Sequence, residues 1–123
     1  MSTERNKWID AVGKLITLTQ ERKLGWRSYS SEGYSALSGR VDVVYQADYN
    51  GKTLRLYESK SRPPRGMFPE SGEWESEAVL DLVDSTGLSI WTFPHTEATE
   101  HLLAAVKYQV AGVGEFIEEL LTT

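Results

Sequence analysis

The sequence predicts an α+β fold with an N-terminal helix, a five-stranded antiparallel meander sheet, and two C-terminal helical segments packed with the first helix on one sheet face. Apolar residues recur at helical spacing near both ends of the chain, and between Tyr34 and Phe93 the spacing changes to alternation interrupted by turn residues. One face of such a sheet needs a cover, and the terminal helices are the elements available to supply it.

The first helix is predicted over residues 4–21, where apolar side chains return every three or four positions. Ser2 or Thr3 is expected to cap its start, and Gly25 to stop it. The predicted buried stripe consists of Trp8, Ile9, Val12, Leu15, Ile16 and Thr19.

The clearest turn of the sheet is Asn50-Gly51, because a two-residue type I′ turn favours these residues at its positive-φ positions. This turn pairs Tyr49 with Lys52 and Ala47 with Leu54, and it places the apolar partners on one face. The other face is mostly polar and is expected to contact solvent. Its predicted pairs are Asp48 with Thr53, Gln46 with Arg55, and Val44 with Tyr57.

Two more turns complete the predicted meander. Ser38-Gly39 would pair Ala36 with Val41 and Tyr34 with Val43. A hairpin over residues 78–93 turns at residues 84–87, and its inward side chains are predicted to be Leu80, Leu82, Leu88 and Ile90. Trp91 and Phe93 then alternate to the outer face, where an apolar patch of several hundred Å² is typical of an interface.

The C-terminal part is predicted to form two helices. Thr96 caps the first, whose apolar residues continue at helical spacing to Val110. Gly112-Val113-Gly114 interrupts the pattern, since each helical glycine is unfavourable by roughly 1 kcal/mol relative to alanine. A short helix over residues 115–121 follows, and its expected buried residues are Phe116, Ile117, Leu120 and Leu121.

One long segment, residues 61–73, has no periodicity and brings basic and apolar side chains together in an acidic chain. It either folds back over the outer apolar patch or contacts a partner. The predicted partner patch combines this segment with the last strand, and its residues are Arg62, Arg65, Met67, Phe68, Trp74, Trp91 and Phe93.

Composition excludes several chemistries. The 123 residues fit one domain, residues 1–123, and the net charge of −5 argues against a general nucleic-acid or anionic-membrane surface. The absence of cysteine excludes disulfides and thiolate catalysis. No apolar stretch approaches the ~20 residues of a membrane span, so we expect a cytoplasmic protein. We predict no catalytic residues, no cofactor and no metal, because His95 and His101 lack the spacing of a helical metal pair.

Two other functions stay open. Glu58-Ser59-Lys60 matches the Glu-x-Lys fragment of Mg²⁺-dependent nucleases, but alternation from the Asn50-Gly51 turn puts Asp42 and Asp48 on the opposite face. Single-stranded nucleic acid could instead stack on Tyr57, Trp91 and Phe93, although a basic groove is missing.

The order of short motifs resembles a diffuse group of small uncharacterised bacterial proteins. The motifs are Leu24-Gly25-Trp26, Tyr34-Ser35-Ala36, Leu102-Leu103 and the run Val110-Ala111-Gly112-Val113. The resemblance implies an α+β fold of this order and no known activity. The leading hypothesis is therefore a non-enzymatic module that binds another protein or itself, in a role such as toxin neutralisation, where an acidic protein blocks a basic partner.

Overall fold

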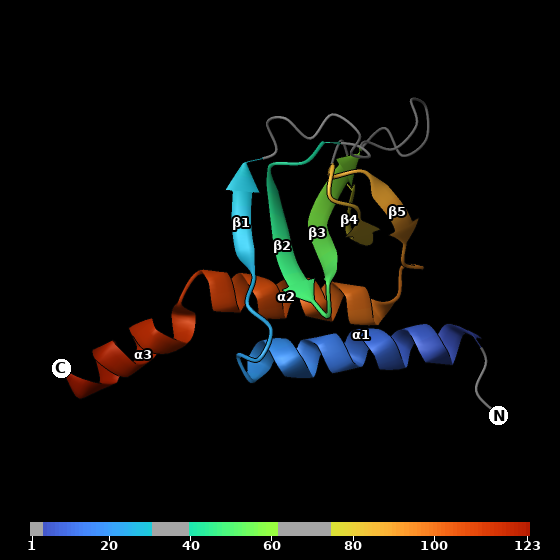
Figure 1. The fold of residues 1–123 in the computed structure, drawn as a ribbon. Helices are drawn as coiled ribbons and strands as arrows, with labels where there is room; N and C mark the ends of the chain where they lie inside the picture. The colour runs from blue at the N-terminus through green and yellow to red at the C-terminus, as the bar shows by residue number, and fades with distance from the viewer. Residues whose placement is uncertain (1–3, 31–39, 62–74) are drawn as a thin grey trace, which may run out of the picture.

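The computed structural model describes residues 4–30, 40–61 and 75–123 and confirms an α+β fold (Figure 1). The chain forms three helices and a five-stranded sheet, with every neighbouring pair of strands antiparallel. The elements are α1 (Glu4–Gln20), β1 (Arg27–Ser30), β2 (Val43–Tyr49), β3 (Lys52–Ser61), β4 (Glu75–Val83), β5 (Ser89–Thr92), α2 (Glu97–Val110) and α3 (Val113–Thr122). Among these described helices, none is long and apolar enough to cross a membrane.

The β2–β3 hairpin confirms the predicted turn and register. Asn50 and Gly51 have φ values of 50° and 76°, which a type I′ turn requires. The pairs Tyr49 with Lys52, Ala47 with Leu54, and Val44 with Tyr57 are all present. Ala47 and Leu54 are buried toward the helices, as predicted.

The first strand differs from the prediction. Val43 pairs with Ser30 of β1, not with Tyr34, so the strand preceding β2 begins earlier in the chain. All four β1 residues are exposed, and a strand without an apolar face leaves no alternation for the sequence to reveal. Tyr34, Ala36 and the Ser38-Gly39 turn lie outside the described residues.

The core lies between one sheet face and the helices α1 and α2. Both helices run in the same direction below the sheet in Figure 1. Their buried side chains join those of the strands in one cluster, which contains Val12, Leu15, Leu24, Trp26, Ala47, Leu54, Leu56, Ala78, Leu80, Leu102, Leu103 and Val106.

Gln109 of α2 fixes the connection between α1 and β1. Its amide nitrogen donates to the backbone carbonyls of Thr19 and Leu24, and its amide oxygen accepts the N–H of Trp26. The Trp26 indole N–H in turn donates to the Thr19 hydroxyl. One amide side chain thus bonds three backbone groups between the last turn of α1 and the residue before β1.

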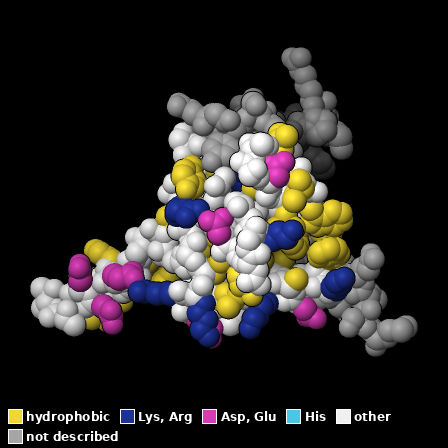
Figure 2. All heavy atoms as spheres, viewed as in Figure 1, with side chains coloured by type: hydrophobic (Ala, Val, Ile, Leu, Met, Phe, Trp, Pro, Cys, Tyr) yellow, Lys and Arg dark blue, Asp and Glu magenta, His cyan; other side chains and the backbone are white. Residues whose placement is uncertain are grey.

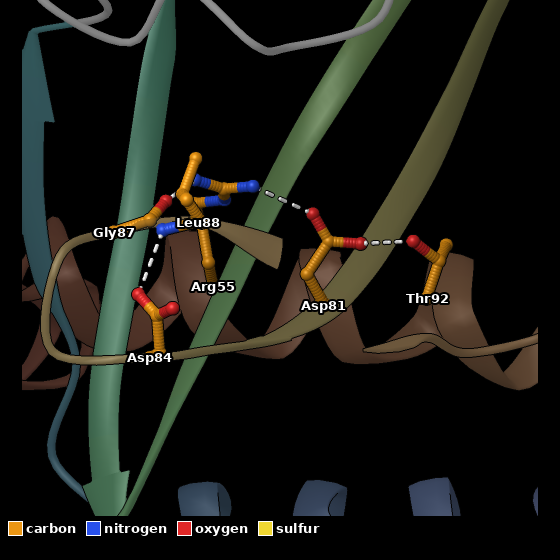
Figure 3. Close-up of polar contacts among 6 residues, drawn as sticks. All are labelled: Arg55, Asp81, Asp84, Gly87, Leu88 and Thr92. Atoms are coloured by element: carbon orange, nitrogen blue, oxygen red, sulfur yellow. Dashed lines mark hydrogen bonds and ion pairs between the residues drawn. The ribbon is translucent and has the colours of Figure 1, made fainter. Parts of the chain in front are cut away.

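We predicted that the outer sheet face contacts solvent, but side chains at its centre are buried. Arg55 and Asp81 form an ion pair of 2.9 Å with side chains only 2% exposed, and Tyr57 and Val44 beside them are buried too. Figure 3 shows how Arg55 also donates to the Gly87 carbonyl in the β4–β5 turn, while Thr92 donates to Asp81. The turn therefore contributes to covering this face, and Arg55 is not a surface residue.

A one-residue bulge explains a second error, in β5. Val83 pairs with Ser89 but Leu82 pairs with Trp91, so Ile90 is the extra residue. The bulge reverses the predicted faces from Ile90 onward: Ile90 is exposed, whereas Phe93 packs against the helix-side core. Leu88, predicted to point inward, lies in the turn before the bulge and is exposed too. The predicted outer patch at Trp91 and Phe93 is therefore wrong.

α3 departs from the predicted helical layer. Its existence and its break from α2 at Gly112 agree with the sequence, but none of its residues is buried. In Figure 1 it extends sideways, away from the sheet and from the α1–α2 pair. The prediction that Phe116, Ile117, Leu120 and Leu121 are buried is wrong within this chain.

Candidate interaction surface

Among the described residues, the most exposed group of large apolar side chains lies on α3. Phe116 and Leu120 are each 62% exposed, and Leu121 is 78% exposed. Together with Ile117 they follow helical spacing along one side of α3, and the polar side carries Glu115, Glu118 and Glu119. We call these four apolar residues the α3 face. It has the composition of a core-facing helix stripe, and among the described residues none of its members belongs to the core cluster.

The base of α3 is held against the body by charge and by a glycine. Gly112 occupies the left-handed region with φ of 66°, which lets the chain change direction between α2 and α3 without the steric penalty of a Cβ. Glu115 in the first turn of α3 forms an ion pair with Arg22, just after α1. The first turn of α3 is thus anchored, while the rest of the helix extends away from the body (Figure 1).

An open groove begins at this anchor. It has a volume of about 780 Å³ and runs between α1 and α2 to the first turn of α3. Its apolar lining includes Ile16, Ala104 and Ala105, and its polar lining includes Arg22 and His101. The small alanines on α2 leave the space that larger side chains would fill, so the groove can receive apolar side chains from outside.

The two surfaces differ in charge. Residues 4–23, which contain α1, carry five basic and three acidic side chains, whereas α3 carries three acidic and no basic side chains. Figure 2 shows the acidic side chains of the α3 extension on the left and several Lys and Arg side chains along the lower body. The overall net charge of −5 is therefore unevenly distributed: α1 itself carries three basic and two acidic side chains, whereas α3 is purely acidic.

The predicted partner patch is not assembled as expected. Trp91 and Phe93 both contact the ring of Trp8 on α1, with ring centroids 5.7 and 5.5 Å apart. They connect β5 to the first helix, although Trp91 keeps an exposed edge. The other members, Arg62, Arg65, Met67, Phe68 and Trp74, lie outside the described residues. Their role in binding a partner stays a prediction.

A second, smaller hollow gathers the residues of the nuclease alternative. Asp42, Glu58 and Lys60 line it together with Tyr45 and Lys107, and its volume is about 210 Å³. The prediction that Asp42 points to the opposite face is wrong. Arg40 pairs with Lys60, and Val44 pairs with Tyr57. Between these two pairs, one strand has three residues (41–43) and the other has two (58–59). The extra residue is a bulge, and it breaks the alternation of side chains at Asp42.

The other predicted carboxylate does stay away from this hollow. Asp48 lies in the regular part of the ladder, where it accepts hydrogen bonds from Arg27 and Thr53. The alternation of β2 therefore applies to Asp48 and fails only at the bulge.

Charges within the hollow are paired. Lys60 donates to Asp42 at 3.0 Å, and this hydrogen bond and positive charge lower the pKa of Asp42. Lys107 lies 3.8 Å from Glu58. Burial, together with the negative charge of Glu58, raises the pKa of Tyr45. Within the described ranges, no group of three or more His, Cys, Asp or Glu side chains could hold a metal ion.

The stacking surface of the nucleic-acid alternative is not present. Tyr57 is buried on the outer sheet face, beside the guanidinium of Arg55. Trp91 and Phe93 face α1, on the other side of the sheet. These three rings therefore do not form one exposed platform for bases.

The chain matches no protein-family model, and no curated protein or solved structure is significantly similar to it. The resemblance to small bacterial α+β proteins stays an expectation, and no residue role is transferred from a relative. The α3 face and the groove are the features that sequence reasoning missed. Helical spacing identified the four apolar residues, but the spacing is the same for a buried stripe and for an uncovered one.

Proposed function

We propose that this protein is a non-enzymatic, cytoplasmic self-association module whose contact element is α3. The observation that supports this proposal is the α3 face, a run of four exposed apolar side chains on a helix with no buried residue. Contiguous apolar surface on a soluble domain is typical of interfaces. The outer sheet face is less suited to this role, because Arg55 and Tyr57 on that face are buried.

The length of α3 supports the same conclusion. A helix of ten residues is only marginally stable by itself in water, and helices of this size owe most of their stability to packing of their apolar side. Burying the α3 face would remove four large side chains from water, each contributing about 1.5–3 kcal/mol when fully buried. Association therefore stabilises both the helix and the complex.

The test compares two leucines of similar exposure. Leu120→Glu places a charge on the α3 face, and Leu88→Glu makes the same change in the β4–β5 turn, where Leu88 is 58% exposed. Light scattering and sedimentation velocity over a range of concentrations should show a dimer for the wild type and for Leu88→Glu, and a monomer for Leu120→Glu. A wild type that is monomeric throughout would contradict the proposal.

A Mg²⁺-dependent nuclease is the second candidate, favoured by the position of Asp42. The bulge brings a carboxylate next to Glu58 and Lys60, which the regular register would not do. Mg²⁺ often binds through one or two carboxylates together with substrate phosphates. In this candidate Asp42 and Glu58 would hold the ion, and Lys60 would assist the attacking water.

A cleavage assay decides the second candidate. Plasmid and single-stranded DNA are incubated with Mg²⁺ or Mn²⁺ and with wild-type protein, Glu58→Ala or Asp42→Asn. Cleavage that both variants abolish, and that Asp48→Asn on the opposite face leaves unchanged, would support it. Equal activity in all variants, or none in the wild type, ends it.

A further inference from the structure

We infer that Asn50 is a site of spontaneous deamidation, and that the native β2–β3 hairpin holds it in an unreactive conformation. Asparagine is a thermolabile residue. It is most labile before glycine, because a residue without a side chain leaves its backbone nitrogen open to react. The chain contains two asparagines, Asn6 and Asn50, and only Asn50 precedes a glycine. The inference concerns the hairpin and does not depend on self-association.

The reaction joins the side chain of Asn50 to the backbone of Gly51. The Gly51 nitrogen attacks Cγ of Asn50, a new C–N bond closes a five-membered succinimide ring, and the side-chain amide leaves as ammonia with the proton from Gly51. Water, the only co-reactant, then adds to one of the two ring carbonyls and opens the ring. One product is aspartate with the original backbone. The other is isoaspartate, whose backbone runs through the former side chain and is one carbon longer.

Water reaches this turn freely. Asn50 and Gly51 are both exposed. Among the described residues, no neighbouring atom lies within 4 Å of the position that a Cβ on Gly51 would occupy. Shielding by neighbouring side chains therefore does not protect the site.

The backbone conformation of the turn protects it instead. Ring closure requires the Gly51 nitrogen and the Cβ of Asn50 to lie on the same side of the Cα–C bond. The φ of Asn50 is 50°, in the left-handed region. A type I′ turn has a ψ of about +30° at this position, which for an L-residue places the next nitrogen nearly opposite Cβ. Attack on Cγ is therefore blocked while the turn is formed.

Side-chain contacts next to the turn keep the hairpin closed. Asp48 and Thr53 face each other one pair away from Tyr49 and Lys52. The Thr53 hydroxyl donates to the Asp48 carboxylate at 2.9 Å, and Arg27 of β1 donates to the same carboxylate at 3.2 Å. Local opening of the hairpin must break these bonds, and its free energy sets how often Asn50 reaches a reactive ψ.

The two products affect the hairpin differently. Aspartate followed by glycine also suits a type I′ turn, so the aspartate form keeps the fold. Isoaspartate lengthens the backbone within a loop of only two residues, and loop length fixes the register of the strands. The isoaspartate form therefore cannot restore the native pairing of Tyr49 with Lys52. Deamidation thus makes an opening of the hairpin permanent.

Peptide mapping by chromatography and mass spectrometry tests the site, since it separates the asparagine, aspartate and isoaspartate peptides. We expect Asn50 to react at least about tenfold more slowly in native buffer than in urea, where the turn is not formed. In urea, Asn50 should react faster than Asn6. Gly51→Ala should slow the reaction of Asn50 in urea, because the added methyl group hinders the attacking nitrogen.

A matched pair of threonine variants tests the role of the hairpin. Thr53→Val keeps the branched shape but removes the hydroxyl that donates to Asp48. We expect it to speed the reaction of Asn50 in native buffer about fivefold, the factor that one typical hydrogen bond contributes, and to change nothing in urea. Thr86→Val is the control, because it removes a hydroxyl that donates to Asp84 in the β4–β5 turn. It should leave the rate at Asn50 unchanged.

The consequence of the reaction is measured on the separated products. Asn50→Asp, which has the backbone of the aspartate product, should keep the wild-type urea midpoint. The isoaspartate form, purified by ion exchange after incubation in urea and refolded, should have a lower midpoint.

Each arm has a contrary outcome. No deamidation of Asn50 in urea, or a faster reaction at Asn6, overturns the site. Equal rates at Asn50 in native buffer and in urea overturn protection by the turn. Equal acceleration by Thr53→Val and Thr86→Val shows that the whole domain must unfold, which overturns control by the hairpin. A wild-type midpoint for the isoaspartate form overturns the permanent effect.

Discussion

Arg55 and Asp81 show how a polar pair can belong to the interior. Their side chains are 2% exposed, and the pair is held by further bonds to the Gly87 carbonyl and the Thr92 hydroxyl. The guanidinium Nε of Arg55 has no hydrogen-bond partner in the structure. A buried pair of this kind is expensive to break by removing one member, because the other charge is left unpaired in a poorly solvated site.

We expect Asp81→Asn to lower the free energy of unfolding by about 3–5 kcal/mol. Asparagine keeps nearly the same shape but leaves Arg55 charged and uncompensated. The double variant Arg55→Met/Asp81→Leu, which removes both charges, should stay within about 1 kcal/mol of the wild type. Urea unfolding followed by circular dichroism measures all three proteins. Similar losses in the single and double variants would show that the ion pair does not act as a unit.

Asp84 predicts an acid dependence of stability. The Thr86 hydroxyl and the backbone N–H groups of Leu88 and Thr86 donate to its carboxylate, and they lower its pKa in the folded protein. The unfolded aspartate titrates at about pH 3.9, so the stabilisation is present above that pH. It is lost as the pH falls through the lower pKa of the folded state.

Unfolding measured between about pH 6 and pH 2 tests this dependence. Asp84→Asn should unfold with a shallower loss of stability on acidification, because asparagine does not titrate. Asp10→Asn, at an exposed position on α1, is the control and should keep the wild-type slope. A wild-type slope in Asp84→Asn would disprove the role of this turn.

At the scale of elements, two bulges decide what the sequence could reveal. The Asn50-Gly51 turn and the six pairs from Val44–Tyr57 to Tyr49–Lys52 agree with the predicted register, because turn chemistry and alternation point to the same pairing there. At Asp42 and at Ile90 one extra residue moves the side chains that follow to the opposite face of the sheet. The residue types at these positions do not indicate a bulge. The candidate hollow and the true side of Trp91 were both missed for this one reason.

The bulge in β5 gives a direct comparison of neighbouring residues. Ile90→Thr should change the free energy of unfolding by less than about 0.5 kcal/mol, because Ile90 is exposed. Trp91→Thr should lower it by about 2 kcal/mol, since it removes the stacked contact with Trp8 that joins β5 to α1. Threonine suits a strand in both cases, so chemical denaturation compares side-chain contacts alone. If Ile90→Thr lowered the free energy of unfolding more than Trp91→Thr does, the register without a bulge would be correct instead.

At the scale of the whole molecule, the sequence predicts each helix but not what each helix packs against. α1 and α2 have apolar stripes that the sheet and each other cover, and their boundaries agree with the predicted ones within two residues. α3 has the same kind of stripe, and its large apolar side chains stay exposed in the described part of the chain. The spacing of apolar residues indicates which side of a helix is buried, but not what buries it. A partner chain can cover that side as well as the core of the same chain can.

Self-association also makes stability depend on concentration. A dimer that binds through α3 links folding to association, so its thermal midpoint rises with protein concentration by mass action. We expect the wild type and Leu88→Glu to show this rise over a hundredfold range of concentration. Leu120→Glu should have a constant midpoint, equal to that of the wild type at high dilution, because none of the α3 residues is buried within the monomer. Scanning calorimetry and far-ultraviolet circular dichroism cover the range. A Leu120→Glu midpoint far below that of the dilute wild type would show that Leu120 stabilises its own chain, which contradicts an α3 face that acts between copies.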